Sequence, residues 1–383
     1  MPDRALASIG VGVDAPSIDA LRGALTRALD EGRPLLPLPA DEAAARSLRP
    51  LAGRAARPGT AVVIATSGST GAVKGVEIGA GALRASANAT IDALGGPGEW
   101  LLALPPHHVA GLQVVVRAAL TAERVEPVAG SFTAASFLAG CAGLTPGSRR
   151  YVSLVPTQLR RLLEPGGPAL AALRDFAGVL VGGAAAGPGL LDRAAAGGVR
   201  VLTTYGMSET CGGCVYDGRG LDGVRVRLDA DGVIELGGPV LASGYLGDEG
   251  GTAAAFRHGW LLTSDLGTLD PDGRLTVLGR ADDMIITGGE KIAPVLVERA
   301  LLELPGVHDA CVLGVPEEEF GQAVGALVVA DREFTLREVR AEMTARLGRA
   351  FAPRRVCAVA ALPLLPSGKP DREAVRRLLR EAG

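Results

Sequence analysis

Ala-Val-Val-Ile-Ala-Thr-Ser-Gly-Ser-Thr-Gly-Ala-Val-Lys-Gly, residues 61–75, joins a short apolar run to a loop rich in glycine and hydroxyl side chains. The β-branched run at 61–65 predicts a buried strand, and a strand that ends in such a loop is typical of α/β proteins. Glycines let the backbone approach an anion, and hydroxyl and backbone N–H groups bind phosphate oxygens. Lys74 adds a positive charge at the end of the loop. These features favour a phosphate site over a flexible linker, although the glycine spacing is not that of a Walker A loop.

Outward from this loop, apolar runs alternate with helical stretches. Strands are expected at 100–104, 151–155, 178–182 and 199–204, and helices at 80–93, 111–120, 157–163 and 187–196. This alternation predicts an α/β fold with a mostly parallel sheet covered on both faces. Upstream of the loop, residues 1–55 are interpreted as helices joined by proline-rich segments.

The pattern of apolar and turn residues changes after about residue 215. Short apolar runs around Asp-Gly pairs predict hairpins of a small antiparallel subdomain. A compact α+β unit follows, in which Thr335 and Glu338 form a capping box for a helix at 336–347. We therefore expect a large N-terminal domain over residues 1–279, with mixed and parallel sheets layered with helices, and a small mobile C-terminal domain over 280–383. The boundary is set at the short polar segment 279–283.

Composition excludes several classes of protein. A formal net charge of −3 and 3% aromatic residues give neither the basic surface nor the stacking surface of a nucleic-acid-binding protein. Residues 1–14 lack a basic stretch followed by an apolar core, and no apolar run reaches the roughly 20 residues that span a bilayer. Five scattered cysteines indicate a reducing cytoplasm rather than a disulfide framework. A cytoplasmic protein without stable membrane insertion is expected, with a homo-oligomer as a possibility.

Three further motifs carry groups suited to nucleotide chemistry. Thr203 to Thr210 follows an apolar strand, and the carboxyl ends of strands are where open α/β sheets bind ligands. In this segment Glu209 could hold Mg²⁺, Ser208 or Thr204 could bind a phosphate, and the Tyr205 ring could stack on a base. The alternative is a turn with a capping glutamate. Asp265, in Thr-Ser-Asp-Leu-Gly, could accept hydrogen bonds from two ribose hydroxyls. The alternative is that it is a turn or cap residue. In Pro-Ser-Gly-Lys-Pro, residues 366–370, a lysine in a rigid turn can neutralise a developing phosphoryl charge, but exposed lysines in turns are also ordinary.

Taken together and in this order, the motifs resemble those of the superfamily of acyl-CoA synthetases, peptide-synthetase adenylation domains and luciferases. The resemblance runs from about residue 60 to 380 and includes Gly182-Gly183-Ala184, similar to an adenine-binding turn, and residues 279–283, similar to a hinge. It implies activation of a carboxylic acid by ATP and Mg²⁺ as an acyl-adenylate, followed by transfer to coenzyme A. Val73 stands where the family usually has proline, which alters the stiffness of the loop and removes no ligand.

The resemblance also implies roles for single residues. Thr66, Ser67, Gly68, Ser69, Thr70, Gly71 and Lys74 would hold the β- and γ-phosphates, and Ser208 and Glu209 would serve the α-phosphate and the metal. The nucleotide site would also include Thr204, Tyr205 and Gly206, with Asp265 and Arg280 at the ribose. Lys369 would be the catalytic lysine, Asp282 the pivot of the hinge, and Gly288-Gly289 would line the approach of the thiol.

The segment Leu104 to Leu112, followed by Arg117, lines the acyl pocket in the family, and Met207 joins His108 and Arg117 as a substrate residue. We expect a helix from Gly111 to turn His108 and Arg117 toward related faces. An arginine within an apolar run is explained if it meets a carboxylate, so an acid with a second carboxylate is favoured. In this the chain resembles the o-succinylbenzoate–CoA ligases of menaquinone biosynthesis. The alternative is that Arg117 reaches the surface and the acid is an ordinary aromatic or fatty acid.

Three other functions stay open. The acceptor could be the thiol of a separate carrier protein or an amine, and a protein of another class would be a non-catalytic nucleotide-binding homologue. Against the last, Lys74, Glu209, Asp265 and Lys369 are all present. Cys211-Gly212-Gly213-Cys214 lacks a second cysteine pair, so we interpret it as small residues at a tight turn without a redox or zinc function.

Overall fold

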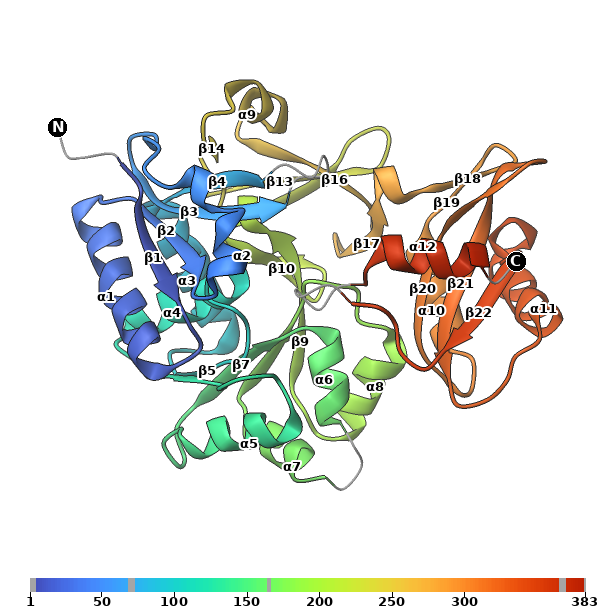
Figure 1. Ribbon diagram of the computed structural model, residues 1–383, viewed down its shortest axis with the longest axis horizontal. Coiled ribbons are helices and arrows are strands. Elements are labelled where there is room, and N and C mark those ends of the chain that lie inside the picture. Colours follow the sequence, from blue (N-terminus) through green and yellow to red (C-terminus); the bar gives the residue numbers. More distant parts are fainter. Residues whose placement is uncertain (1–4, 68–72, 164–166, 365–369, 382–383) are drawn as a thin grey trace. The chain divides into compact units, whose positions relative to one another are not determined.

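The computed structural model describes residues 5–67, 73–163, 167–364 and 370–381. Its backbone divides into two compact units, shown as ribbons in Figure 1. The first unit holds residues 1–183, 194–227 and 235–263, and the second holds 184–193, 228–234 and 264–383. The chain passes between the units five times, at 183/184, 193/194, 227/228, 234/235 and 263/264. The functional boundary at 279/280 stays a prediction.

The first sheet of the first unit carries the glycine-rich loop. Its strand order is β1-β2-β3-β4-β14, that is Ala7–Val11, Leu35–Pro39, Thr60–Ser67, Val73–Gly79 and Gly244–Tyr245. β1, β2 and β3 run parallel, whereas β4 is antiparallel to both β3 and β14. The loop is thus the connection of the β3–β4 hairpin.

The alternating side chains of β3 explain why this strand is apolar throughout. Val62 and Ile64 lie in the core that includes α1 (Ala15–Glu31). Val63 and Ala65 point to the opposite face and lie in a second core. That core contains side chains of α2 (Glu42–Arg46) and η1 (Arg49–Leu51). Because both faces are covered, every position from 61 to 65 is buried.

The second sheet has seven strands in the order β11-β10-β9-β8-β7-β5-β6. They are Arg219–Gly220, Gly212–Tyr216, Val201–Met207, Gly178–Val181, Arg150–Leu154, Glu99–Leu102 and Val125–Pro127. The five strands from β9 to β6 are parallel, and β10 and β11 form an antiparallel edge. The expected parallel sheet is therefore confirmed, with an edge hairpin added beside β9.

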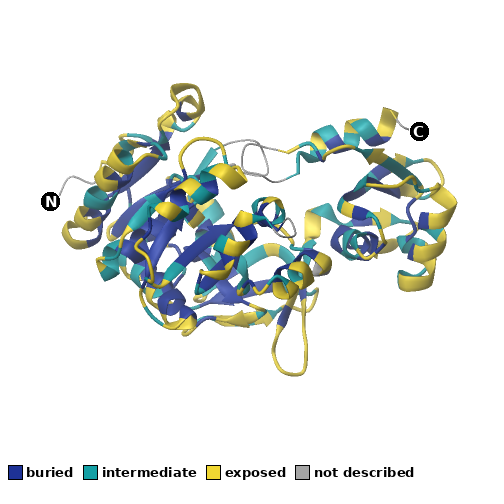
Figure 2. Ribbon diagram, turned by 90° about the horizontal axis from the view of Figure 1, so that it is seen from below, coloured by how far each residue is buried: buried dark blue, intermediate teal, exposed yellow. Residues whose placement is uncertain are grey.

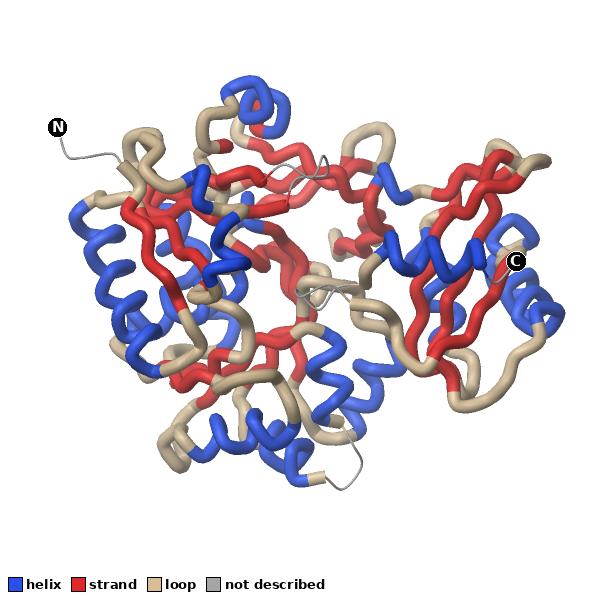
Figure 3. Tube along the Cα trace, viewed as in Figure 1, coloured by secondary structure: helices blue, strands red, loops and turns tan. Residues whose placement is uncertain are grey.

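Helices cover both faces of this sheet, as the tube view in Figure 3 shows. α1, α3 (Ala80–Leu94) and α4 (Val109–Thr121) contact one another, and their apolar side chains share one core with strands of the first and second sheets. On the other side of the second sheet lie α5 (Ala134–Ala142), α6 (Pro156–Leu162) and α7 (Pro168–Arg174). Figure 2 shows the strands of this unit as its most buried part.

The third sheet contains the expected Asp-Gly hairpins. Its order is β12-β13-β16-β15, and β17 pairs with β16. The strands are Arg225–Leu228, Val233–Gly237, Trp260–Leu269, Phe256–Arg257 and Leu275–Arg280, and α9 is Glu249–Ala255. Gly232 and Gly273 occupy the left-handed region at the two hairpin turns, with φ of 80° and 74°.

The fourth sheet forms the middle of the second unit. Its order is β19-β18-β21-β20, with β22 parallel to β21. These are Glu290–Ile292, Ile285–Thr287, Gly321–Ala330, Val307–Glu317 and Arg355–Val359. Val312 lies in a core shared with α10 (Pro294–Leu302) and α11 (Leu336–Leu347), and Leu313 lies in one shared with α12 (Arg372–Glu381). The capping box of α11 is confirmed, because the Glu338 backbone N–H donates to Thr335 Oγ1 at 3.2 Å.

The remaining helical segments are short. α8 spans Pro188–Ala196, and three 3-10 turns are η2 (Ser208–Thr210), η3 (Ala281–Asp283) and η4 (Arg349–Phe351). None of the helices within the described ranges is long and apolar enough to cross a membrane.

One expectation about the N-terminal third was wrong, and one strand was not predicted. Residues 1–55 contain the strands β1 and β2 as well as helices. The prolines in Leu-Leu-Pro-Leu-Pro argue against an inner strand, but β2 pairs with β3 only at Leu35, so Pro37 and Pro39 remove no bond from that ladder. β4 was also missed, because its side chains are buried on both faces and Glu77 interrupts the apolar run.

Candidate functional site

The β3–β4 hairpin brings the two ends of the glycine-rich loop together. Thr66 is the cross-strand partner of Lys74. Their Cβ atoms therefore lie within the ~5 Å typical of directly opposed residues. Gly68, Ser69, Thr70 and Gly71 lie outside the described residues, and the side chain of Ser67 is not described. The structure thus places Thr66 and Lys74 side by side at the base of the loop.

The carboxyl end of β9 lies beside the end of β8. A Cβ atom at Gly182 would lie 2.2 Å from Thr204 Oγ1, so the glycine allows the turn after β8 to approach the threonine. Gly183 continues this turn with φ of 79°, and Ala184 after it is exposed. The structure therefore places Gly182, the first residue of the predicted adenine turn, beside Thr204.

Gly206 is required by the edge hairpin that follows. A Cβ atom at this position would lie 2.1 Å from the carbonyl oxygen of Gly212 in β10. The backbones can approach only because Gly206 has no side chain. Tyr205, the neighbouring residue, is half-buried.

The 3-10 turn η2 begins directly after Met207 and carries Ser208 and Glu209. Thr210 Oγ1 accepts the Met207 N–H at 2.9 Å and donates to the carbonyl of Gly212 at 2.8 Å. The Ala242 N–H donates to the carbonyl of Glu209 at 2.8 Å. The backbone of Glu209 is thereby held from two sides, while its carboxylate projects from the turn.

Tyr245 in β14 joins two of the predicted phosphate-site residues. Its hydroxyl donates a hydrogen bond to Glu209 Oε1 at 3.0 Å. Lys74 Nζ lies 5.1 Å from the centroid of the same ring, within the range of a cation–π contact. Sequence reasoning missed Tyr245, because a single tyrosine after a serine and a glycine carries no signal of its own.

The donor set at Glu209 fits a magnesium ion. The described residues contain no cluster of three or more histidine, cysteine, aspartate or glutamate side chains. A zinc site takes three or four such protein ligands, whereas Mg²⁺ is bound through one or two carboxylates together with waters and substrate phosphates. Glu209 is half-buried, so it can supply the single carboxylate.

The predicted ribose residues are direct partners in the β16–β17 ladder, where Asp265 lies opposite Arg280. Arg280 also makes a bidentate pair with the predicted hinge residue, since Nε and Nη2 donate to the two carboxylate oxygens of Asp282 at 2.9 and 3.0 Å. This pair raises the pKa of Arg280 and lowers the pKa of Asp282. The guanidinium predicted to bind ribose thus also pairs with the predicted hinge residue.

Lys369 lies outside the described residues, but both ends of its loop are described. Leu364 and Pro370 form an antiparallel bridge, and the Asp371 N–H donates to the carbonyl of Pro363 at 2.9 Å. Asp371 Oδ1 then accepts the Glu373 and Ala374 N–H groups at 3.1 Å, which caps α12. The loop that carries the lysine therefore starts and ends at a fixed base.

The expectation that His108 and Arg117 share a face of α4 was wrong. His108 is the exposed N-cap residue of the helix, whereas Arg117 is 3% exposed. Nine residues make two and a half turns at about 3.6 residues per turn, which puts them on opposite sides. The adjacent His107 is partly buried, and burial together with His108 lowers its pKa to about 4.

Arg117 does not reach the surface, which removes that explanation for its place in an apolar run. Its guanidinium carbon lies 5.0 Å from the centroid of the Trp100 ring. Burial lowers its pKa, yet an arginine side chain stays charged in proteins. Its Nε atom and both amide atoms of Gln113, one turn earlier, have no hydrogen-bond partner among the described residues. Gln113 is fully buried and lies beside Gly212, and sequence reasoning missed it.

Two remaining motifs lie in the described part of the chain, and their roles stay predictions. Gly288 and Gly289 form the β18–β19 turn with φ of 56° and 86°. Cys211 and Cys214 are buried free thiols, and burial raises the pKa of both. Such thiols are poor nucleophiles at neutral pH.

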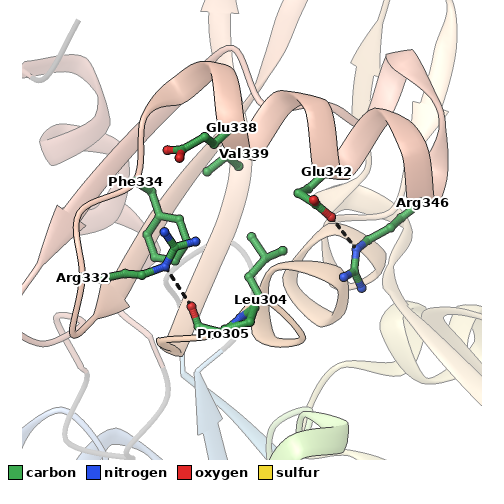
Figure 4. Close-up of a pocket in the computed structure, with 8 residues that line it drawn as sticks. All are labelled: Leu304, Pro305, Arg332, Phe334, Glu338, Val339, Glu342 and Arg346. Carbon is green, nitrogen blue, oxygen red and sulfur yellow. Dashed lines mark hydrogen bonds and ion pairs between the residues drawn. The ribbon is translucent and has the colours of Figure 1, made fainter.

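A shallow cavity of about 150 Å³ in the second unit, shown in Figure 4, contains none of the candidate residues. Its charged side chains are engaged with their neighbours, since Arg332 Nε donates to Pro305 and Arg346 pairs with Glu303 and Glu342.

Comparison with known proteins gives a consistent result. Residues 13–246 match the family described as AMP-binding enzyme, and residues 296–369 match its C-terminal domain. The probable 2-succinylbenzoate–CoA ligase of Mycobacterium tuberculosis is 47% identical over 331 residues, which cover 84% of this chain and 85% of the relative.

Two solved structures resemble the fold at 27% identity. One is the o-succinylbenzoate CoA synthetase (MenE) from Bacillus subtilis with the acyl-adenylate intermediate OSB-AMP, with a TM-score of 0.77 over 97% of this chain and 88% of that one. The other is the amide bond synthetase McbA from Marinactinospora thermotolerans, with a TM-score of 0.81 over 98% and 90%. Because the family match spans more than half of its residues and the identity to one relative reaches 47%, this chain belongs to the family of AMP-binding enzymes.

Proposed function

We propose that this chain is an ATP-dependent 2-succinylbenzoate–CoA ligase of menaquinone biosynthesis. In the first half-reaction a carboxylate oxygen of the acid attacks the α-phosphorus of ATP, and pyrophosphate leaves. In the second, the thiolate sulfur of coenzyme A attacks the acyl carbon, and AMP leaves. The observation that carries the choice of acid is the buried, charged Arg117 on the helix that lines the acyl pocket in related enzymes.

The phosphate residues supply what the first step needs. The α-phosphorus is shielded by negative oxygens, so attack by a carboxylate requires positive charge around the triphosphate. Lys74 and the hydroxyl-rich loop would hold the β- and γ-phosphates, and Ser208 would bind the α-phosphate. Mg²⁺, held through Glu209, would neutralise phosphate charge when bound. Lys369 would stabilise the charge that develops as pyrophosphate leaves.

The remaining nucleotide residues would orient ATP. Asp265 and Arg280 would bind the ribose, and Tyr205 and residues 182–184 would contact the adenine. Asp265 and Arg280 are paired across the β16–β17 ladder, so one backbone register sets their spacing. This register supports a ribose site in which the two side chains start from adjacent positions of one ladder.

The acid would be recognised through its second carboxylate. 2-Succinylbenzoate carries two carboxylates, of which one is activated and the other is available for recognition. A buried guanidinium with an unpartnered Nε is suited to such a group, because a charge-assisted hydrogen bond offsets the cost of burying the cation. His108 and Met207 stay predictions for contacts at the reacting end of the acid.

Pyrophosphate release tests this function most directly. The enzyme would be incubated with Mg²⁺, ATP and either 2-succinylbenzoate, benzoate or a fatty acid, each with and without coenzyme A. We expect pyrophosphate with 2-succinylbenzoate, and a thioester detected by mass only when coenzyme A is present. Release of pyrophosphate with benzoate or the fatty acid but not with 2-succinylbenzoate would overturn the choice of substrate. Absence of release with every acid would favour a non-catalytic nucleotide-binding homologue.

A second acceptor has specific support from the fold. The likeness to an amide bond synthetase, at a TM-score of 0.81, favours an amine as the alternative nucleophile. A separate carrier protein would present a thiol as coenzyme A does. An amine or a carrier protein can be supplied in place of coenzyme A. The mass of the product then shows which of the three acceptors the enzyme uses.

We further propose that the chain works as two domains, over residues 1–279 and 280–383, that rotate about Asp282 between the half-reactions. The bidentate pair between Arg280 and Asp282 supports a defined conformation at this point. Replacing Asp282 with proline is expected to slow thioester formation from preformed acyl-adenylate about ten-fold or more, because proline restricts the backbone that must rotate. Single-turnover assays of each half-reaction measure this.

Asp282→Ala is the matched control for the hinge. It removes the carboxylate that pairs with Arg280 but leaves the backbone able to rotate. We expect it to retain thioester formation better than Asp282→Pro. Equal rates in the two variants would show that the pivot lies elsewhere.

A cytoplasmic location completes the proposal. All five cysteines are free thiols, which suits a reducing compartment. The acid, ATP and coenzyme A would be its small-molecule partners, and assembly into a homo-oligomer stays a prediction.

A further inference from the structure

Tyr245 contacts oppositely charged residues on two different elements of the first unit. Its hydroxyl is 3.0 Å from Glu209 Oε1, next to the end of β9, and its ring centroid is 5.1 Å from Lys74 Nζ in β4. Phe256 packs edge-on against the ring, with centroids 5.8 Å apart. One aromatic side chain thus lies in direct contact with both a predicted metal ligand and a predicted phosphate ligand.

The position of Tyr245 is set by its backbone. β14 pairs with β4, where Tyr245 is the partner of Val76. The Tyr245 N–H donates to Thr252 Oγ1 at 2.9 Å, and its carbonyl accepts from Arg57 Nη1 at 3.0 Å. Arg57 is in turn paired with the buried carboxylate of Glu77. These bonds hold the backbone from which the Tyr245 ring extends.

The two charged groups have separate tasks in adenylation, and direct pairing between them would impair both. Glu209 must offer an oxygen to a cation, and Lys74 must offer its ammonium group to phosphate. A flexible lysine near a carboxylate forms an ion pair when nothing prevents it. The Tyr245 ring gives the ammonium group an uncharged partner, and its hydroxyl occupies one oxygen of the carboxylate while leaving the other.

We propose that Tyr245 is a positioning residue that orients Glu209 toward Mg²⁺ and keeps Lys74 from pairing with it, an inference that rests on the proposed adenylation function. Tyr245 takes no part in bond making. Its effect should therefore fall on metal-dependent adenylation and spare the attack of the thiol on a preformed acyl-adenylate.

Two substitutions separate the hydroxyl from the ring. Tyr245→Phe removes only the hydrogen bond to Glu209, and we expect the Mg²⁺ concentration for half-maximal pyrophosphate release to rise about ten-fold, the size of a lost bond to a charged group. Tyr245→Leu also removes the cation–π contact, so the KM for ATP should rise in addition. Thioester formation from supplied acyl-adenylate should stay within about two-fold of the original enzyme in both variants.

Tyr151→Phe is the matched control. Tyr151 is a tyrosine of the same unit that donates a hydrogen bond to the carbonyl of Gly96 at 2.8 Å, and it has no hydrogen bond to the described candidate phosphate residues. The Tyr151→Phe substitution should lower the melting temperature without changing the Mg²⁺ dependence of pyrophosphate release. A general loss of stability therefore cannot imitate the expected result.

A binding measurement makes the test independent of turnover. Mn²⁺ replaces Mg²⁺, and its paramagnetic resonance signal reports binding in the presence of ATP. We expect Mn²⁺ to bind about ten-fold more weakly to Tyr245→Phe than to the original enzyme. Unchanged Mn²⁺ binding and Mg²⁺ dependence, in an enzyme that releases pyrophosphate, would overturn the role of Tyr245. An original enzyme that releases none with any acid would instead contradict the proposed function.

Discussion

Replacing Lys369 with alanine is expected to lower the rate of acyl-adenylate formation about 100- to 1,000-fold, the usual loss when one preorganised charge at a transition state is removed. Thioester formation from supplied acyl-adenylate should keep most of its rate, because no phosphoryl group is transferred in that step. The loop has a fixed base, with Leu364 bridged to Pro370 and α12 capped by Asp371, so truncating the side chain leaves the frame in place. Rapid-quench measurement of each half-reaction gives the two rates.

The lysine content of the chain supplies the controls. Only three of its 39 basic residues are lysines, namely Lys74, Lys291 and Lys369, so arginine is the default cation of this sequence. Lys369→Arg retains the charge but replaces a compact ammonium group with a planar fork, and we expect a partial loss. Lys291→Ala removes an exposed lysine of β19 and should leave adenylation unchanged. An equal loss of both half-reactions in Lys369→Ala would contradict the assignment of this lysine to the first step.

The sequence predicted the parts of the fold in which local pattern and tertiary role agree. The strand at 61–65 and the strands β5, β7 and β8 have apolar runs that match their burial, and α11 has the capping box that its sequence indicates. The prediction failed for β2 and β4, because the local sequence of each strand argues against a buried strand. Prolines in β2 argue against a strand, and Glu77 in β4 is a buried carboxylate whose ion-pair partner, Arg57, lies 20 residues away. Only the tertiary contact explains such a residue.

In the candidate site, too, some residues have a signal in the local sequence, whereas others are explained only by tertiary contacts. Motif spacing places Thr66 and Lys74 on one loop, and Gly206, Ser208 and Glu209 after one strand. It says nothing of β14, which pairs with β4 although more than 160 residues separate them in the chain. Tyr245 therefore had no signal in the sequence.

The opposite orientation of His108 and Arg117 had a different cause. It follows from helical geometry alone, because a separation of nine residues is two and a half turns at about 3.6 residues per turn and so places two side chains on opposite sides of a helix. The bidentate pair between Arg280 and Asp282, by contrast, depends on side-chain conformations that spacing does not determine.

Replacing Arg117 with methionine should produce the second large effect, a rise of about 100-fold in the KM for 2-succinylbenzoate with little change in the KM for ATP. Truncating one partner of a buried charge pair costs about 2–5 kcal/mol, which corresponds to about 30-fold or more in affinity. Methionine keeps most of the volume beside Trp100, so the fold is retained better than with alanine. The KM values, checked by acid binding without turnover, measure the effect.

A comparison of substrates identifies the interaction as the one with the second carboxylate. Benzoate has a single carboxylate, which must be the one that is activated, so removing Arg117 cannot remove an interaction that benzoate never makes. If Arg117 binds that carboxylate, the methionine variant should lose its preference for 2-succinylbenzoate over benzoate, and the two changes should be strongly non-additive. If Arg117 serves only to pack against Trp100, the melting temperature would change while the KM for the acid and the preference stay as they were. Gln113→Leu should have the smaller effect of the two, because its unpartnered amide carries no net charge to pair with a carboxylate.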